Sequence, residues 1–234
     1  MGLRFCGLTG LSGQSLGNVG ERAVSYRVNR PLPSTVRLWT LQPILVWEEL
    51  RQHGSLYVDP VHHSDVDDFQ KKAYEWLREQ TAQRIPGYRG HYPWWANDFK
   101  LDLRSQRKAF GKPGERYVRL ELAVPQEQVL LSAYGAWHCV LNRWYLPYAT
   151  DPDGWDQESA AWEAELTVQG IDRWSSALPE PYHSRMVASW NRIFDADDLR
   201  ETNTIQATFE RLALENVVTV TEYIVQKSSW RSGE

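Results

Sequence analysis

Hydrophobic and polar residues alternate in several short stretches of the chain, which is the pattern of half-buried β-strands. The alternation is strictest at residues 117–124, where every second position is apolar. Strands are predicted at residues 36–42, 56–58, 117–124, 129–131, 204–209 and 217–225. They are separated by stretches in which apolar residues recur at helical spacing instead.

The helical stretches carry recognisable start and stop residues. Pro43 suits the first turn of a helix that Gly54 ends. Ser64 can cap the next helix, with Asp67 three residues on as the acidic half of a capping box, and that helix fades before Pro86. Further helices are predicted at residues 136–142, 155–168 and 184–194.

Strands and helices interleave without regular βαβ repetition, which favours the α+β class over a doubly wound sheet. We therefore expect a single α+β domain over residues 35–234, with a mixed, mainly antiparallel split sheet and flanking helices. Residues 1–34 are rich in Gly, Ser and Arg and are predicted to be a flexible N-terminal arm.

Charge and composition narrow the class of protein. The formal net charge is −4 and the isoelectric point about 5.9, so the chain lacks the basic excess of a general electrostatic nucleic-acid binder. Two cysteines, Cys6 and Cys139, support neither a disulfide framework nor a paired-cysteine zinc site. No apolar run is long enough for a membrane helix or a secretory signal, and a cytoplasmic location without membrane contact is expected.

Two groups of residues are candidates for metal binding or catalysis, and each could instead have a purely structural role. His62 and His63, followed by acidic residues, suggest metal ligands, but acids also suit a helix N-terminus, and no metal is predicted. His138 lies on a predicted helix near Asn142 and is a candidate general base or substrate contact. The alternative is a half-buried imidazole that is hydrogen-bonded to the backbone.

Aromatic and basic residues supply candidate binding groups. Trp94 and Trp95 follow Pro93 in a predicted loop and would form either an aromatic platform or apolar anchors to the core. Arg104 belongs to a basic stretch at residues 100–112 that either steers a phosphate-bearing ligand or is a solvated loop face. The chain holds 12 tryptophans, a content that fits a core or a stacking surface equally.

Several sequence words together resemble a bacterial family described only as a domain of unknown function. The words are V-R-L-W-T-L-Q-P, W-E-E-L-R-Q-H-G, Y-P-W-W, Y-V-R-L-E-L-A-V-P, A-W-H-C-V-L-N and I-Q-A-T-F. They span the chain from about residue 35 to the C-terminus and imply no activity by themselves.

A fainter similarity concerns the fold of ADP-ribosyltransferases. A strand with W-T-x-Q, a helix ending in Gly and a short strand resemble the opening of such folds, and I-Q-A-T-F resembles the late strand that carries their catalytic Glu. The resemblance implies that Trp39, Thr40 and Gln42 hold the nicotinamide side of NAD, with His138 and Gln206 near the reacting ribose. Here Gln206 stands where the family has Glu, and a glutamine supplies no negative charge.

The resemblance thus implies an enzyme that binds NAD as a substrate and modifies a nucleic acid or a protein, with the NAD-contacting residues converging on one cleft. The alternative function is a non-catalytic nucleic-acid or peptide binding module that uses Trp94 and Trp95.

Overall fold

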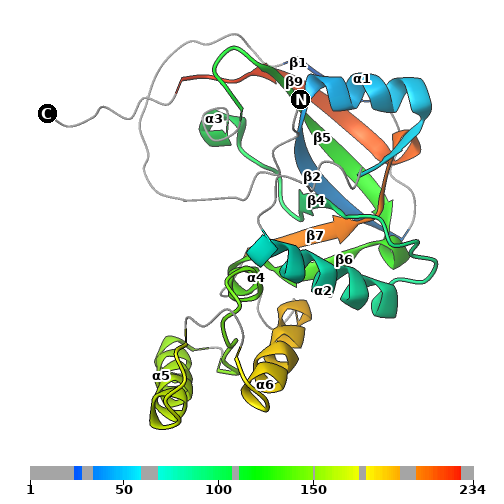
Figure 1. Ribbon diagram of the computed structural model, residues 1–234. Helices are drawn as coiled ribbons and strands as arrows, with labels where there is room; N and C mark the ends of the chain where they lie inside the picture. The colour runs from blue at the N-terminus through cyan, green and yellow to red at the C-terminus, as the bar shows by residue number, and fades with distance from the viewer. Residues whose placement is uncertain are drawn as a thin grey trace, which may run out of the picture. The chain divides into compact units, whose positions relative to one another are not determined.

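A computed structural model describes residues 24–27, 34–58, 68–106, 111–149, 151–173, 178–195 and 204–227 (Figure 1). The chain divides into two compact units. Unit 1 comprises residues 1–62, 96–126 and 211–234, and unit 2 comprises residues 63–95 and 127–210. Antiparallel strand pairs and helices occur in both units, so the predicted α+β class with mainly antiparallel strands is confirmed.

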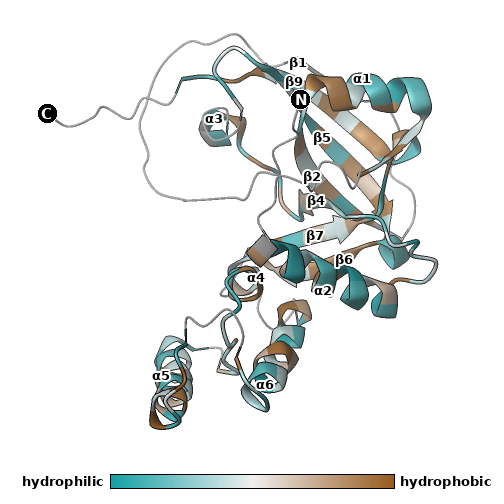
Figure 2. Cartoon of the chain, viewed as in Figure 1, coloured by the Kyte–Doolittle hydropathy of each residue, from teal (hydrophilic) through white to brown (hydrophobic). Residues whose placement is uncertain are grey.

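Unit 1 is built on an antiparallel sheet whose strands alternate apolar and polar residues (Figure 2). Its adjacent strands are, in order, β1 (Val24–Arg27), β9 (Val217–Ile224), β5 (Arg116–Pro125) and β2 (Thr35–Pro43). The end of β4 (Trp94–Asn97) lies on the other side of β2, where Asn97 is paired with Trp39. β2 is thus an inner strand of this sheet.

One face of this sheet is covered by α1 (Ile44–His53), which buries Val46, Trp47 and Leu50. The Trp47 indole Nε1–H donates a hydrogen bond to the Tyr26 hydroxyl at 3.2 Å, which ties the helix to β1. As predicted, α1 ends at Gly54, whose φ of 76° is left-handed and whose N–H donates to the carbonyl of Leu50.

The opposite face is partly covered by the segment containing α3 (Leu103–Gln106) (Figure 1). Leu103 packs there against Tyr223 and Val225, with Leu41 and Tyr117 at the margin. Unit 1 also contains a small antiparallel pair formed by β3 (Ser55–Tyr57) and β8 (Arg211–Ala213). The sheet therefore presents one apolar face under α1 and one mixed face toward α3.

Unit 2 combines an antiparallel strand pair with several helices. The pair consists of β6 (Leu130–Ala133) and β7 (Ile205–Phe209). The helices are α2 (Asp68–Arg84), α4 (Tyr134–Leu141), α5 (Pro152–Val168) and α6 (Tyr182–Ser189), with 3-10 turns at Gln126–Gln128 and Trp190–Phe194. Asp151 caps the N-terminus of α5, and its carboxylate accepts the N–H of Gly154 at 2.8 Å.

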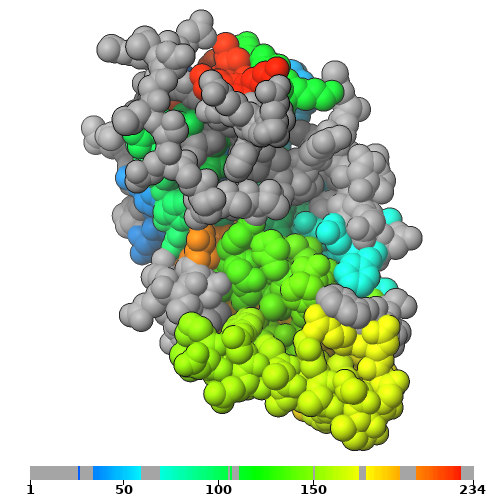
Figure 3. All heavy atoms as spheres, turned by 90° about the vertical axis from the view of Figure 1, so that its left-hand side faces the viewer, coloured from blue at the N-terminus to red at the C-terminus, as the bar shows by residue number. Residues whose placement is uncertain are grey.

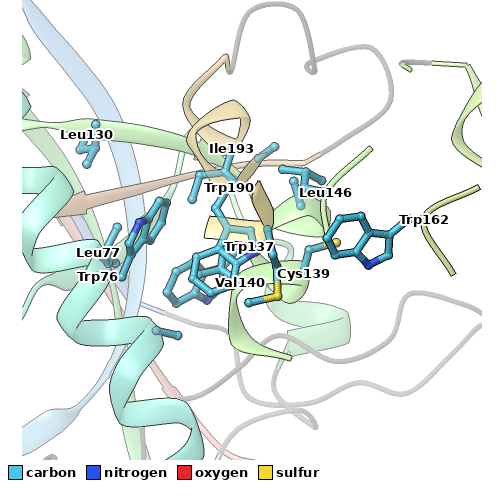
Figure 4. Close-up of a cluster of buried hydrophobic side chains, with 14 of the residues drawn as sticks. Trp76, Leu77, Leu130, Trp137, Cys139, Val140, Leu146, Trp162, Trp190 and Ile193 are labelled. Carbon is cyan, nitrogen blue, oxygen red and sulfur yellow. The ribbon is translucent and has the colours of Figure 1, made fainter. Parts of the chain in front are cut away.

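Tryptophans fill the core of unit 2 (Figure 4). Trp76 stacks on Phe194 at 5.7 Å between ring centroids and meets Trp190 edge-on at 5.5 Å. Trp162 is stacked on Tyr145 at 4.6 Å. Much of the unusual tryptophan content therefore serves packing, where large rings bury the most apolar area.

One prediction needs correction, and two others concern residues that the structure describes only in part or not at all. Trp94 and Trp95 form strand β4 rather than a loop, because two consecutive aromatic residues gave no alternation to recognise. Residues 24–27 of the predicted arm form strand β1, which pairs with β9, and the flexibility of the arm as a whole stays a prediction. The capping box of Ser64, and the histidine pair beside it, lie outside the described residues.

Glu210, which directly follows β7, holds the loop that precedes β4. Its Oε1 accepts the backbone N–H groups of Arg89 at 2.8 Å and His91 at 3.0 Å, and it lies 2.9 Å from His91 Nδ1. The Tyr88 hydroxyl donates to the His91 carbonyl at 2.5 Å. One half-buried carboxylate thus fixes a loop that is distant in sequence.

Replacing Glu210 with alanine should lower the free energy of unfolding by about 1.5–3 kcal/mol, because charged hydrogen bonds to backbone amides are lost. Urea denaturation measures this change. Glu163→Ala is the matched control, since Glu163 pairs with Arg173 at the surface, and its loss should cost below about 1 kcal/mol. Equal destabilisation by both variants would contradict the role assigned to Glu210.

Candidate functional site

The three residues expected to bind NAD from β2 lie on two faces of the sheet. Thr40 and Gln42 alternate with Trp39, so their side chains project from the face that carries Leu38. There Gln42 Nε2 donates to Thr40 Oγ1 at 2.8 Å. Trp39 projects from the opposite face, together with Leu41. A ligand on one face of β2 therefore contacts Thr40 and Gln42, or Trp39, but not all three.

His138 has the backbone-bonded arrangement that was the structural alternative for it. Its Nδ1 lies 3.0 Å from the carbonyl oxygen of Tyr134, and its ring meets the Tyr134 ring edge-on at 4.7 Å. Asn142 Nδ2 donates to the His138 carbonyl at 2.7 Å, which closes the end of α4. Both side chains thus have local structural partners.

Gln206 is buried in β7. Its Nε2 donates to Ser132 Oγ at 3.2 Å, and the two residues are directly paired between β7 and β6. All residues of β7 are buried, so Gln206 is an interior polar residue with a defined partner. Gln206 and His138 belong to unit 2 and the β2 residues to unit 1, and their convergence on one cleft stays a prediction.

The predicted binding residues Trp94, Trp95 and Arg104 also contact other residues of the protein. Trp94 is buried, and Trp95 lies 5.3 Å from the Trp137 ring, so they anchor the core rather than form an exposed platform. Arg104 Nε donates to both carboxylate oxygens of Asp102, at 3.1 and 3.0 Å. This contact lowers the pKa of Asp102 and raises that of Arg104.

A row of polar and aromatic residues crosses the sheet of unit 1 on the face opposite α1. The register places Trp39 of β2 directly opposite Asn97 of β4 and Glu121 of β5, and Glu121 opposite Thr219 of β9. Directly paired residues project from the same face, with neighbouring Cβ atoms about 4.5–5.5 Å apart. The register therefore brings an indole, a carboxamide and a carboxylate together.

Two buried polar atoms in this row lack a hydrogen-bond partner among the described residues. They are the donor Nε1 of Trp39 and the acceptor Oδ1 of Asn97. Leaving such an atom unpaired costs about 1–3 kcal/mol, so a water molecule or a ligand is expected to pair with it. A ligand carrying one acceptor and one donor would satisfy both.

Charged residues surround the same row. Glu121 forms an ion pair with Arg37, and its side chain is 17% exposed while that of Arg37 is 44% exposed. Arg119, opposite Leu41 in the register, donates to the Leu101 carbonyl at 2.6 Å. Burial lowers the pKa of Arg119, and nearby Asp102 and Tyr223 partly offset this. On this face the carboxylate of Glu121 thus lies between the guanidinium groups of Arg37 and Arg119.

Sequence reasoning named Trp39 but missed Asn97, Glu121, Arg37 and Arg119. The one available signal was the pair of charged residues inside the strictly alternating strand at 117–124. It showed that one face of that strand is polar. It did not show that Glu121 is paired with Trp39, because a register between distant strands cannot be read from either strand alone.

Metal binding and catalysis by a cysteine thiol find less support within the described part of the chain. No three His, Cys, Asp or Glu side chains there are grouped as metal ligands. Burial raises the pKa of Cys139 to about 11, so its thiol is a poor nucleophile at neutral pH. None of the described helices is both long enough and apolar enough to cross a membrane.

Comparison with known proteins places the chain in a family without assigning an activity. A family model described as "Domain of unknown function (DUF3841)" matches residues 37–218. This range agrees with the family resemblance expected from the sequence words. No curated protein and no solved structure matches the chain.

The burial of Gln206 leads to a test of its structural role. Gln206→Ala should lower the free energy of unfolding by about 1–3 kcal/mol, since it leaves Ser132 unpaired in the interior. Combining it with Ser132→Ala should cost less than the sum of the two single changes. Additive effects in denaturant unfolding would show that the two side chains do not interact.

Proposed function

The chain belongs to the DUF3841 family, and we propose that it is an ADP-ribosyltransferase-like enzyme that binds NAD on the Trp39 face of unit 1. In this proposal it cleaves the bond between nicotinamide and ribose and transfers ADP-ribose to a nucleic acid or a protein. The observation that carries the proposal is the row formed by Asn97, Trp39 and Glu121.

The unpaired atoms of the row complement the amide of nicotinamide. A carboxamide has an oxygen that accepts and an NH₂ group that donates hydrogen bonds. Trp39 Nε1 would donate to the amide oxygen, and Asn97 Oδ1 would accept from the amide nitrogen. The ligand would thereby pair two buried groups that otherwise destabilise the fold, which supports a carboxamide over a purely anionic or apolar ligand.

Glu121 would supply the charge that Gln206 cannot. When the glycosidic bond breaks, its electron pair moves to the cationic nicotinamide nitrogen, and positive charge develops at the ribose C1′. A neighbouring carboxylate stabilises such an oxocarbenium-like transition state. A nucleophile on the target then bonds to C1′ and loses its proton. Arg37 and Arg119 are suited to the diphosphate, since guanidinium groups bind phosphate oxygens in pairs.

A nicotinamide-release assay tests this proposal. The purified full chain is incubated with NAD, alone and with DNA, RNA or cell extract, and free nicotinamide is quantified by chromatography. Glu121→Gln keeps the side-chain volume but removes the charge, and should lower the release rate about 100-fold or more. Unfolding should change by less than about 1 kcal/mol, because the ion pair with Arg37 is partly exposed.

The matched control is Glu222→Gln. Glu222 also lies on the sheet of unit 1 and also pairs with an arginine, Arg116, at 2.9 Å. It stands outside the row and should leave the release rate unchanged. The proposal fails if the wild-type chain neither binds NAD nor releases nicotinamide with any target, or if the Glu121 and Glu222 variants behave alike.

A further inference from the structure

One tryptophan and one asparagine of unit 1 place an unpaired donor and an unpaired acceptor on neighbouring strands. Trp39 of β2 and Asn97 of β4 are directly paired, so their Cβ atoms are about 4.5–5.5 Å apart on one face of the sheet. Nε1 of Trp39 and Oδ1 of Asn97 are both buried, and neither has a hydrogen-bond partner among the described residues. The two atoms are therefore not bonded to each other, and one small group that lies between them can bond to both.

The hydrogen-bonding needs of the two atoms differ, and this decides which group satisfies both. The indole N–H of Trp39 only donates, and the amide oxygen Oδ1 of Asn97 only accepts. A neutral primary carboxamide supplies an oxygen to the first and an NH₂ group to the second. A carboxylate supplies two oxygens and no proton, so that one of its oxygens would meet the lone pairs of Asn97 Oδ1. Asn97 is thus the residue that can distinguish the two groups.

The arginines of the same face attract carboxylates in general, but both already have partners. Arg37 forms an ion pair with Glu121, and Arg119 donates to the carbonyl of Leu101 at 2.6 Å. Asn97, by contrast, is only 6% exposed, so water cannot easily replace a hydrogen bond that a ligand fails to make there. We therefore expect the contact with Asn97 to decide which ligand is accepted.

We infer that the pair of Trp39 and Asn97 binds neutral primary carboxamides and rejects carboxylates, with Asn97 as the residue that sets this specificity. The inference rests on the proposed function in taking the nicotinamide ring of NAD as the natural ligand, but carboxamide binding itself requires no cleavage. Two consequences follow for the proposed reaction. The dinucleotide whose ring carries a carboxylate in place of the amide is not a substrate, and free nicotinamide, the released product, competes with NAD for the pair.

Free nicotinamide and nicotinic acid test the inference, because they differ only in the amide and the carboxyl group. Each is titrated at neutral pH, where nicotinic acid is a carboxylate, into the full chain without NAD, and binding is followed by ligand-observed NMR. Nicotinic acid should bind about 5- to 150-fold more weakly than nicotinamide, the effect of leaving one buried acceptor unpaired.

Two variants should give different signatures. Asn97→Leu removes the acceptor at similar volume, so nicotinamide should lose its advantage over nicotinic acid, while the melting temperature stays the same or rises because an unpaired buried atom is gone. Trp39→Phe removes the donor that both ligands use, so both should bind more weakly and the preference for the amide should remain.

Gln157→Leu is the matched control, since it also replaces a carboxamide side chain with leucine. Gln157 is exposed on α5, whose yellow-green atoms lie at the surface of unit 2 in Figure 3. This change should alter neither the affinity for nicotinamide nor the preference over nicotinic acid.

Three outcomes would overturn the inference. Nicotinic acid binds as tightly as nicotinamide, nicotinamide does not bind at any concentration up to its solubility, or Asn97→Leu keeps the wild-type preference. Nicotinamide binding without release of nicotinamide from NAD would contradict only the proposed transferase. Equal release of the free ring from NAD and from its nicotinic acid analogue would contradict this inference alone.

Discussion

The pairing of β2 with its two neighbours is the constraint on which the rest of unit 1 depends. Because β2 lies between β5 and the end of β4, each of its residues has a fixed partner on a fixed face. That register assigns Leu38 to the apolar face under α1 and Trp39 to the mixed face. A shift by one residue would exchange the two faces, burying Arg37 and exposing Leu38. The same constraint that builds the core therefore also assembles the polar row.

The two units use aromatic residues in different ways. In unit 2, the side chains of Trp76, Trp162 and Trp190 belong to one buried cluster that forms the interior. In unit 1, Trp39 is only partly buried and leaves its indole N–H unpaired among the described residues. Composition could not separate these roles, since a tryptophan's function is decided by where its N–H group points and not by its frequency.

Local sequence patterns predicted much of the fold, but they could not predict which distant strands pair. The strict alternation of residues 117–124 gave β5, and Gly54 marked the end of α1, because both are set by neighbouring residues. β4 was missed, since Trp94 and Trp95 carry no periodicity of their own and form a strand only through their neighbours. Glu121 was visible as a charge within a strand, but its place beside Trp39 depends on a register that no single segment encodes.

The order of strands in unit 1 has a consequence for how the chain folds during synthesis. Among the strands that the structure describes, β9 is the last in chain order, and it lies between β1, the first of them, and β5. β1 therefore leaves the ribosome long before its pairing partner exists, and one edge of β5 stays open until β9 emerges. Such non-local closure slows folding and leaves strand edges open to other chains in the meantime. The segments that make up unit 2 are all synthesised before β9, so this unit can form while the sheet of unit 1 is still incomplete.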